Sequence, residues 1–165
     1  MSSAPRTSRP HMPEYGLEAD DAGGGLLPWS WAVERLERSR NYWLSTVRSD
    51  GRPHAMAVWA VWLDGALLFS TAVGSRKARN LARSPQCVMS TERADEAVIV
   101  EGVAERVGDA QLLTRLRVVY EAKYGSGYPP DSGVWAVRPL VVFGFIERAE
   151  AFAGSATRWS FSGGA

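Results

Sequence analysis

The segment His54–Leu63 is apolar on both of its alternating faces, and this constrains the fold more than any other feature of the chain. A strand with one face in water alternates polar and apolar residues, so a strand of this kind is predicted to be covered twice. In a barrel, one face fills the interior. The other face then meets the chain's own helices, or a ligand and a second subunit, and the pattern leaves both alternatives open.

Short strand-like runs separated by turn residues follow along most of the chain. They predict strands over 41–48, 54–63, 66–71, 86–91, 97–107, 134–137 and 140–146, with a bulge at Gly102. Helices are predicted from Pro28 to about Ser39, after Gly74, and from an Asp109 cap to about Tyr124. This order predicts a mostly β fold with flanking helices, in the form of a closed or split antiparallel barrel.

Composition divides the chain into two parts. Residues 1–25 are rich in Ser, Pro and Gly without apolar periodicity, and are predicted to be disordered or an arm that lies on a partner. Residues 26–165 are long enough for a single domain with a sizeable core. The net charge of +1 is spread along the chain, which argues against a nucleic-acid binder.

A cytoplasmic protein is expected, because Cys87 is the only cysteine and no apolar run is long enough for a membrane span or a signal peptide. Cys87 is predicted to be a small buried hydrophobe rather than a nucleophile. No metal site is expected, since the histidines and the cysteine lack ligand spacing. The spacing of a phosphate-loop NTPase is also absent.

The segment Phe69–Leu81 brings hydroxyl groups, a glycine turn and cations together at the start of a short helix. Ser70 and Thr71 end the strand, Ser75 is a candidate N-cap, and Arg76 and Lys77 occupy the first helical turn. Free backbone N–H groups and the helix dipole make such a start favourable for a phosphate or carboxylate. The simpler interpretation is an ordinary capped helix with solvated arginines.

Gly74-Ser75-Arg76-Lys77-Ala78, placed after a strand that ends Phe69-x-Thr71, resembles the phosphate-binding segment of the pyridoxamine 5'-phosphate oxidase-like split β-barrel superfamily. The similarity covers roughly Asn41–Val107. It implies a split barrel like the FMN-binding proteins and a homodimer in which the outer face of His54–Leu63 meets the second subunit and the flavin ring. The cofactor-binding residues implied are Met56, Val58, Trp59, Ser70, Thr71, Ser75, Arg76, Lys77 and Asn80.

Departures from the family pattern narrow the activity. The oxidases proper carry an arginine and a lysine on the second strand, where this chain has Met56 and Val61, and vitamin phosphate oxidation is therefore disfavoured. The chain looks more like the actinobacterial branch, whose members use the deazaflavin coenzyme F-420 or FMN. The resemblance implies hydride transfer to a small organic acceptor, with no catalytic residue assigned. A non-catalytic cofactor-binding protein is the alternative.

Coenzyme F-420 is favoured over FMN because it carries several negative charges in a row. Arg76, Lys77 and Arg79 lie within four residues of one another, and Arg52 and Arg158 are expected nearby. The terminal segment Ala156–Phe161 is a candidate to close over a ligand.

Overall fold

The computed structural model describes residues 4–20 and 25–162. The strands are β1 (Arg6–Ser8), β2 (Tyr42–Val47), β3 (Pro53–Val58), β4 (Ala60–Leu63), β5 (Ala66–Ala72), β6 (Gln86–Thr91), β7 (Glu96–Arg106), β8 (Ser132–Ile146) and β9 (Thr157–Ser160). The helices are α1 (Trp29–Arg38), α2 (Arg76–Arg83), α3 (Ala110–Tyr124) and α4 (Phe152–Ser155).

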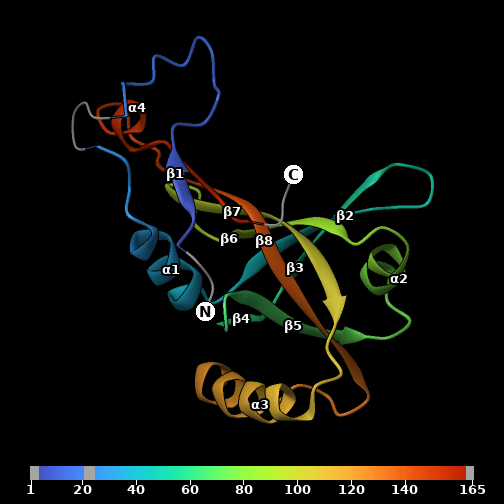
Figure 1. The fold of residues 1–165 in the computed structure, drawn as a ribbon. Helices are drawn as coiled ribbons and strands as arrows, with labels where there is room; N and C mark the ends of the chain where they lie inside the picture. The colour runs from blue at the N-terminus through green and yellow to red at the C-terminus, as the bar shows by residue number, and fades with distance from the viewer. Residues whose placement is uncertain (1–3, 21–24, 163–165) are drawn as a thin grey trace.

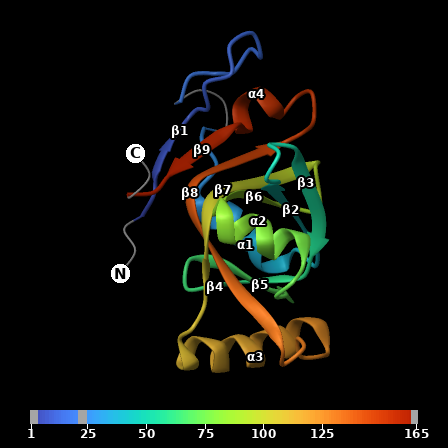
Figure 2. The same cartoon turned by 90° about the vertical axis from the view of Figure 1, so that its right-hand side faces the viewer.

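The strands form one antiparallel sheet that branches, and the predicted split barrel is confirmed. The main path runs β1-β9-β8-β7-β6-β2-β3, and β5 pairs with both β4 and β8 outside that path. Figures 1 and 2 show α3 beside β4 and β5 at one end of the molecule, and α4 with β1 at the other. Because β3 ends the path, its outer edge has no strand partner within the described residues.

Strand β8 is shared by both branches. Its first residues pair with β5 and its last with β9, while β7 pairs along most of its length. The expectation of two strands separated by Arg138-Pro139 is therefore wrong. The register shifts between Glu101 and Gly102, opposite Pro139, so the expected bulge accommodates the proline without ending the strand. A Cβ on Gly102 would lie 2.4 Å from the carbonyl oxygen of Arg138.

The expectation of one continuous strand over His54–Leu63 is also wrong, because the run divides at Trp59. Strand β3 pairs with β2, whereas β4 pairs with β5. The physical reason is that the chain leaves one branch of the sheet after Val58 and joins the other at Ala60. One straight strand could not form hydrogen bonds with both β2 and β5.

The double covering predicted for this run holds for β4 but not for β3. Ala60 and Trp62 belong to or pack on the main core, while Val61 and Leu63 join a second core with Leu116 of α3. On β3, by contrast, Ala55, Met56 and Ala57 are exposed.

Helices α2 and α3 begin at their predicted caps, and α1 begins directly after Pro28. The Ser75 hydroxyl accepts from the Ala78 amide at the start of α2, and Asp109 accepts from Leu112 at the start of α3. The buried side of α3 carries Leu116, Tyr120 and Tyr124, whereas Val119 is 37 % exposed. Within the described part of the chain, no helix combines the length and apolarity needed to cross a bilayer.

The two ends of the chain lie side by side in the sheet. Within the N-terminal segment, Arg6–Ser8 form β1 and pair with β9. Residues 1–3 and 21–24 lie outside the described residues. The C-terminal segment expected to close over a ligand is instead β9. Thr157 and Trp159 are fully buried there, because Trp159 packs edge-on against Trp29 in the main core.

Cys87 is buried in β6, as expected, and belongs to the main core. Burial raises the pKa of its thiol to about 12, so the thiol stays protonated at neutral pH. A protonated, buried thiol is a poor nucleophile.

Candidate functional site

A pocket of about 310 Å³ opens where the division between β3 and β4 faces the end of β5 and the start of α2. It combines an indole, two hydroxyl groups, an amide and an ammonium group. Its lining residues are Asn41, Ala57, Val58, Trp59, Ser70, Thr71 and Lys77. Five of the sequence-predicted cofactor-binding residues therefore lie around one pocket: Val58, Trp59, Ser70, Thr71 and Lys77.

The hydroxyl side of the pocket is built by the strand–turn–helix segment. The Oγ atoms of Thr71 and Ser75 lie 3.0 Å apart, and the Ser75 Oγ accepts from the Ala78 amide at 3.2 Å. Ser75 thus caps α2 and ties the helix to the end of β5. This contact fixes Lys77, in the first turn of α2, beside Ser70 and Thr71.

The aromatic side is Trp59, which is 40 % exposed. Its ring stacks on Tyr124, with centroids 4.5 Å apart and an interplanar angle of 5°. The Tyr124 hydroxyl accepts from the Ala60 amide at 2.9 Å and lies 2.8 Å from the carbonyl oxygens of both Arg40 and Ala60. One face of Trp59 is therefore held by a fixed tyrosine, which suits it to contact a flat ligand.

Lys123 adds contacts that hold the segment around Trp59 in place. Its Nζ donates to the Tyr42 hydroxyl at 2.8 Å and to the Ala60 carbonyl at 3.0 Å. Burial lowers the pKa of Lys123 to about 8, and burial also raises the pKa of Tyr124 to about 12. These groups hold the point where β3 ends and β4 begins, so they position Trp59 from outside the pocket.

Cations gather at the α2 side of the pocket without acidic partners. Within residues 4–20 and 25–162, the side chains of Arg48, Arg76 and Lys77 form no hydrogen bond or ion pair, and the buried Nε of Arg48 has no partner. His54 lies in the field of all three: burial first, and then these cations, lower the pKa of its imidazole. No carboxylate of the described residues forms an ion pair with these three cations, so the region can attract an anion.

Four of the predicted site residues do not line the pocket. Ser75 acts as the helix cap, and Arg76 is exposed on α2. Met56 is 46 % exposed on β3. Asn80 is buried, and its Nδ2 donates to the Thr46 Oγ1 at 2.9 Å, so it connects α2 to β2.

Three cations expected near the site have other partners. Arg52 pairs with Asp50 in the β2–β3 turn, and Arg79 donates to the Gly74 carbonyl at 2.6 Å. Arg158 lies on β9 and donates to Ser160. Each is held by a neighbour close in sequence, which is why counting arginines overestimated the charge that this site presents.

Sequence reasoning missed Asn41 and Ala57 in the lining, and Arg48 and His54 in the charged region. Asn41 is oriented by Glu92, which accepts from its Nδ2 at 2.8 Å. The signal that could have found His54 is the β2–β3 hairpin register, in which His54 faces Thr46.

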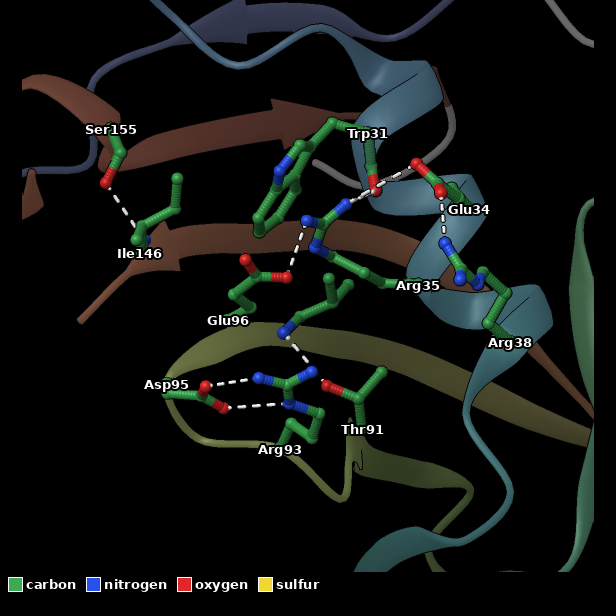
Figure 3. A network of polar contacts seen from close by, with 11 residues as sticks. Trp31, Glu34, Arg35, Arg38, Thr91, Arg93, Asp95, Glu96, Ile146 and Ser155 are labelled. Carbon is green, nitrogen blue, oxygen red and sulfur yellow. Dashed lines mark hydrogen bonds and ion pairs between the residues drawn. The ribbon is translucent and has the colours of Figure 1, made fainter. Parts of the chain in front are cut away.

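A second charged pocket lies between the end of α1 and the turn from β6 to β7, and its cations are paired (Figure 3). Arg35 donates to Glu96 at 2.6 Å, and its guanidinium lies 3.8 Å from the centre of the Trp31 ring. Arg38 pairs with Glu34, and Arg93 with Asp95. This pocket has little net charge to offer a ligand.

The chain folds into a branched antiparallel sheet with a cationic, hydroxyl-lined pocket between β3 and β4. These features place it among the split-barrel proteins. Within that class, it belongs to the pyridoxamine 5'-phosphate oxidase family, whose model matches residues 32–145.

Two similar proteins and one protein of the same fold illustrate the comparison. A pyridoxine/pyridoxamine 5'-phosphate oxidase of Bacteroides thetaiotaomicron is 30% identical over 115 residues, which are 67% of this chain and 54% of that protein. A solved structure described as an F420 reductase is 28% identical, with a TM-score of 0.56 over 66% of this chain and 93% of that one. A conserved hypothetical protein from Mycobacterium tuberculosis shares the fold at 24% identity, with a TM-score of 0.63 over 87% and 89%. The chain thus spans about half the length of the curated relative it matches.

Proposed function

We propose that the protein is an oxidoreductase that transfers a hydride between a bound flavin-type cofactor and a small organic acceptor. Lys77, Ser70 and Thr71 would hold the cofactor's phosphate, and Trp59 would contact its ring system. The cofactor would supply the redox chemistry. The chain would bind and orient it and exclude water.

The observation that carries this proposal is the combination of unpaired cations and a supported indole in one pocket. Lys77 lines the pocket and forms no hydrogen bond or ion pair among the described residues. Trp59 lines it too, with one face held by Tyr124. A cofactor with a phosphate and a flat ring fits both features at once.

Between the two cofactors, the deazaflavin coenzyme F-420 remains the favoured one. Arg48 adds a cation that the sequence did not single out, beside Arg76 and Lys77, and FMN ends at a single phosphate. The similarity to an F420 reductase supports the same choice. Against pyridoxamine phosphate oxidation, neither position of the oxidases' arginine and lysine supplies a phosphate ligand: Met56 is exposed and does not line the pocket, and Val61 is buried in the second core.

The decisive experiment is to titrate the purified apoprotein with coenzyme F-420 and with FMN, following tryptophan fluorescence. Both are expected to quench Trp59, with tighter binding of F-420, and Trp59→Phe should remove most of the signal. Tighter binding of FMN would reverse the cofactor assignment. Stoichiometric binding without turnover over a broad panel of acceptors would favour the non-catalytic alternative.

The proposed assembly is a homodimer that covers β3. Trp43 and Met56 are 52 % and 46 % exposed, and the neighbouring Ala55 and Ala57 are exposed as well. An edge strand with an apolar surface invites a second copy. Because Ala57 also lines the pocket, the second copy would lie next to the cofactor.

Light scattering coupled to size exclusion tests the dimer. Twice the mass of 18.0 kDa is expected for the native chain at micromolar concentration. Met56→Glu should shift the equilibrium toward the monomer, and Val118→Glu, on the exposed side of α3, is the control. A soluble native monomer would refute the assembly.

A further inference from the structure

We infer that His54, next to this pocket, is an anion-binding residue that takes up a proton when a dianionic group binds beside Lys77. The inference deepens the proposed function, on which it rests. It concerns a residue of β3 that neither the sequence motif nor the pocket lining identifies.

The position of His54 follows from the hairpin register and the helical spacing of α2. In the β2–β3 pairing, His54 faces Thr46. Asn80 donates to Thr46 from α2, and Arg76 and Lys77 precede Asn80 by four and three residues, on the same side of the helix. The Asn80–Thr46 contact therefore brings the first turn of α2 toward His54.

Thr46 can accommodate both protonation states of the imidazole. Its Oγ1 accepts from Asn80 at 2.9 Å and lies 3.5 Å from both the Nδ1 and the carbonyl oxygen of His54. With a neutral ring, the hydroxyl proton can point to Nδ1. With a protonated ring, Nδ1–H points to Oγ1, and the hydroxyl turns to the carbonyl. Proton uptake therefore leaves no buried polar atom without a partner.

The charged groups that face His54 are Arg48, at the end of β2, and Arg76 and Lys77 of α2, and all are cations. Together with burial they lower the pKa of the imidazole, which is therefore neutral at pH 7 in the free protein. A bound dianion would offset this repulsion and attract the imidazolium directly. The pKa of His54 would then rise on binding.

Linkage gives the sign of the pH dependence. A group whose pKa rises on binding takes up a proton in the interval between its two pKa values. Affinity for the anion is then lowest above the pKa of the bound state, increases as the pH falls through that value, and levels off below the pKa of the free state. The effect is separate from any titration of the ligand if the ligand's own charge is constant.

Sulfate provides such a probe, because it stays doubly charged throughout the range in which histidine titrates. The imidazole C–H signals of the full chain would be followed by NMR from about pH 5 to about pH 8, with sulfate or with chloride at matched ionic strength. The chain has only two histidines, so His11→Gln assigns His54 and serves as the control. His54→Gln is the test variant for binding.

Sulfate is expected to raise the pKa of His54 by about half a unit or more, which corresponds to about a threefold gain in affinity on the acid side. Lys77→Ala should reduce this rise, and His54→Gln should remove the acid-side gain while His11→Gln keeps it. A His54 pKa that does not respond to sulfate would overturn the inference, as would an unchanged pH dependence of binding in His54→Gln.

The two proposals fail separately. If F-420 and FMN do not bind although sulfate raises the pKa of His54, the proposed function is wrong and the anion site stands. If a cofactor binds through Lys77 and the pKa of His54 stays unchanged, the function stands and His54 has no part in it.

Discussion

Cations lie at both charged pockets of this molecule, but their partners differ. Between α1 and the β6–β7 turn, Arg35, Arg38 and Arg93 each face a carboxylate (Figure 3). Beside α2, Arg48, Arg76 and Lys77 face a neutral histidine, hydroxyl groups and an indole, with no ion pair among the described residues.

The difference shows which cations are structural and which are available. An arginine held by a carboxylate and an aromatic ring stabilises the fold, and its charge is already neutralised. A cation that the fold leaves unpaired contributes little to stability and keeps its charge for a ligand. Cation counts alone do not make this distinction. The distinction depends on whether a carboxylate or an aromatic ring contacts each cation.

The largest expected effect is on cofactor binding by Lys77→Ala. Loss of a charge-assisted hydrogen bond should weaken binding of F-420 or FMN by about 1.5–3 kcal/mol. The free energy of unfolding should stay nearly constant, because the side chain has no partner in the fold. Fluorescence titration measures the affinity, and urea denaturation measures the free energy of unfolding. Arg83→Ala, at the exposed end of the same helix, is the control, and equal affinities in both variants would contradict the site.

Arg35→Ala should have the reverse profile. It removes the Glu96 pair and the Trp31 contact, where the Arg35 side chain is only 21% exposed. A loss of about 1–2 kcal/mol in the free energy of unfolding is expected, with unchanged cofactor affinity. Arg38→Ala removes a much more exposed pair and should change stability by less than about 0.5 kcal/mol. Weaker cofactor binding in Arg35→Ala would contradict the conclusion that only the cations beside α2 serve the ligand.

Ionic strength should affect cofactor binding more than stability, and the effect should be smaller than that of the substitutions above. Raising ionic strength from low to physiological values is expected to weaken cofactor binding by about threefold or more, because the unpaired cations at the site attract an anion through solvent. The urea midpoint should move much less. Lys77→Ala should reduce the salt dependence of binding. A salt-independent affinity would mean that the cations do not contact the ligand.

A separate effect, on stability against pH, concerns Lys123, a cation whose hydrogen-bond partners are neutral. Its pKa is lowered to about 8 in the folded chain, so between about pH 8 and pH 10 the unfolded chain binds more protons and stability should rise with pH. Above about pH 10 the raised pKa values of Tyr42 and Tyr124 reverse the slope, because the folded chain then holds more protons. Urea denaturation across this range should show the rise in the native chain. If stability still rises between about pH 8 and pH 10 in Lys123→Met, Lys123 is not the group responsible.

Local signals predicted the fold well, and pairing between distant segments explains the errors. The caps Ser75 and Asp109 and the strand Gln86–Thr91 lie where the residues predict. The division at Trp59 was missed because β3 and β4 take different partner strands. The strand β8 continues through Pro139 because β8 carries an extra residue, Leu140, opposite the step from Glu101 to Gly102 in β7, a segment distant in sequence.

The same reasoning explains the site. Val58, Trp59, Ser70, Thr71 and Lys77 come together as proposed, because one strand–turn–helix segment and the adjoining strand carry them. Arg48 and His54 were missed because only the hairpin register and the Asn80–Thr46 contact bring them near α2. Arg79 was misjudged because its guanidinium donates to the backbone carbonyl of Gly74, five residues earlier in the chain.

The sharing of β8 has a consequence for how the protein is made. Ser70 and Thr71 pair with Val134 and Gly133, so these two hydroxyl residues of β5 gain their strand partner only after residue 134 has been synthesised, although β5 already pairs with β4. The pairs are far apart in sequence, which slows folding, and β4 and β5 wait as an exposed hairpin in the nascent chain. The site is therefore encoded early and assembled late. A ribosome-bound chain that ends before β8 should present every pocket-lining residue without holding them in place.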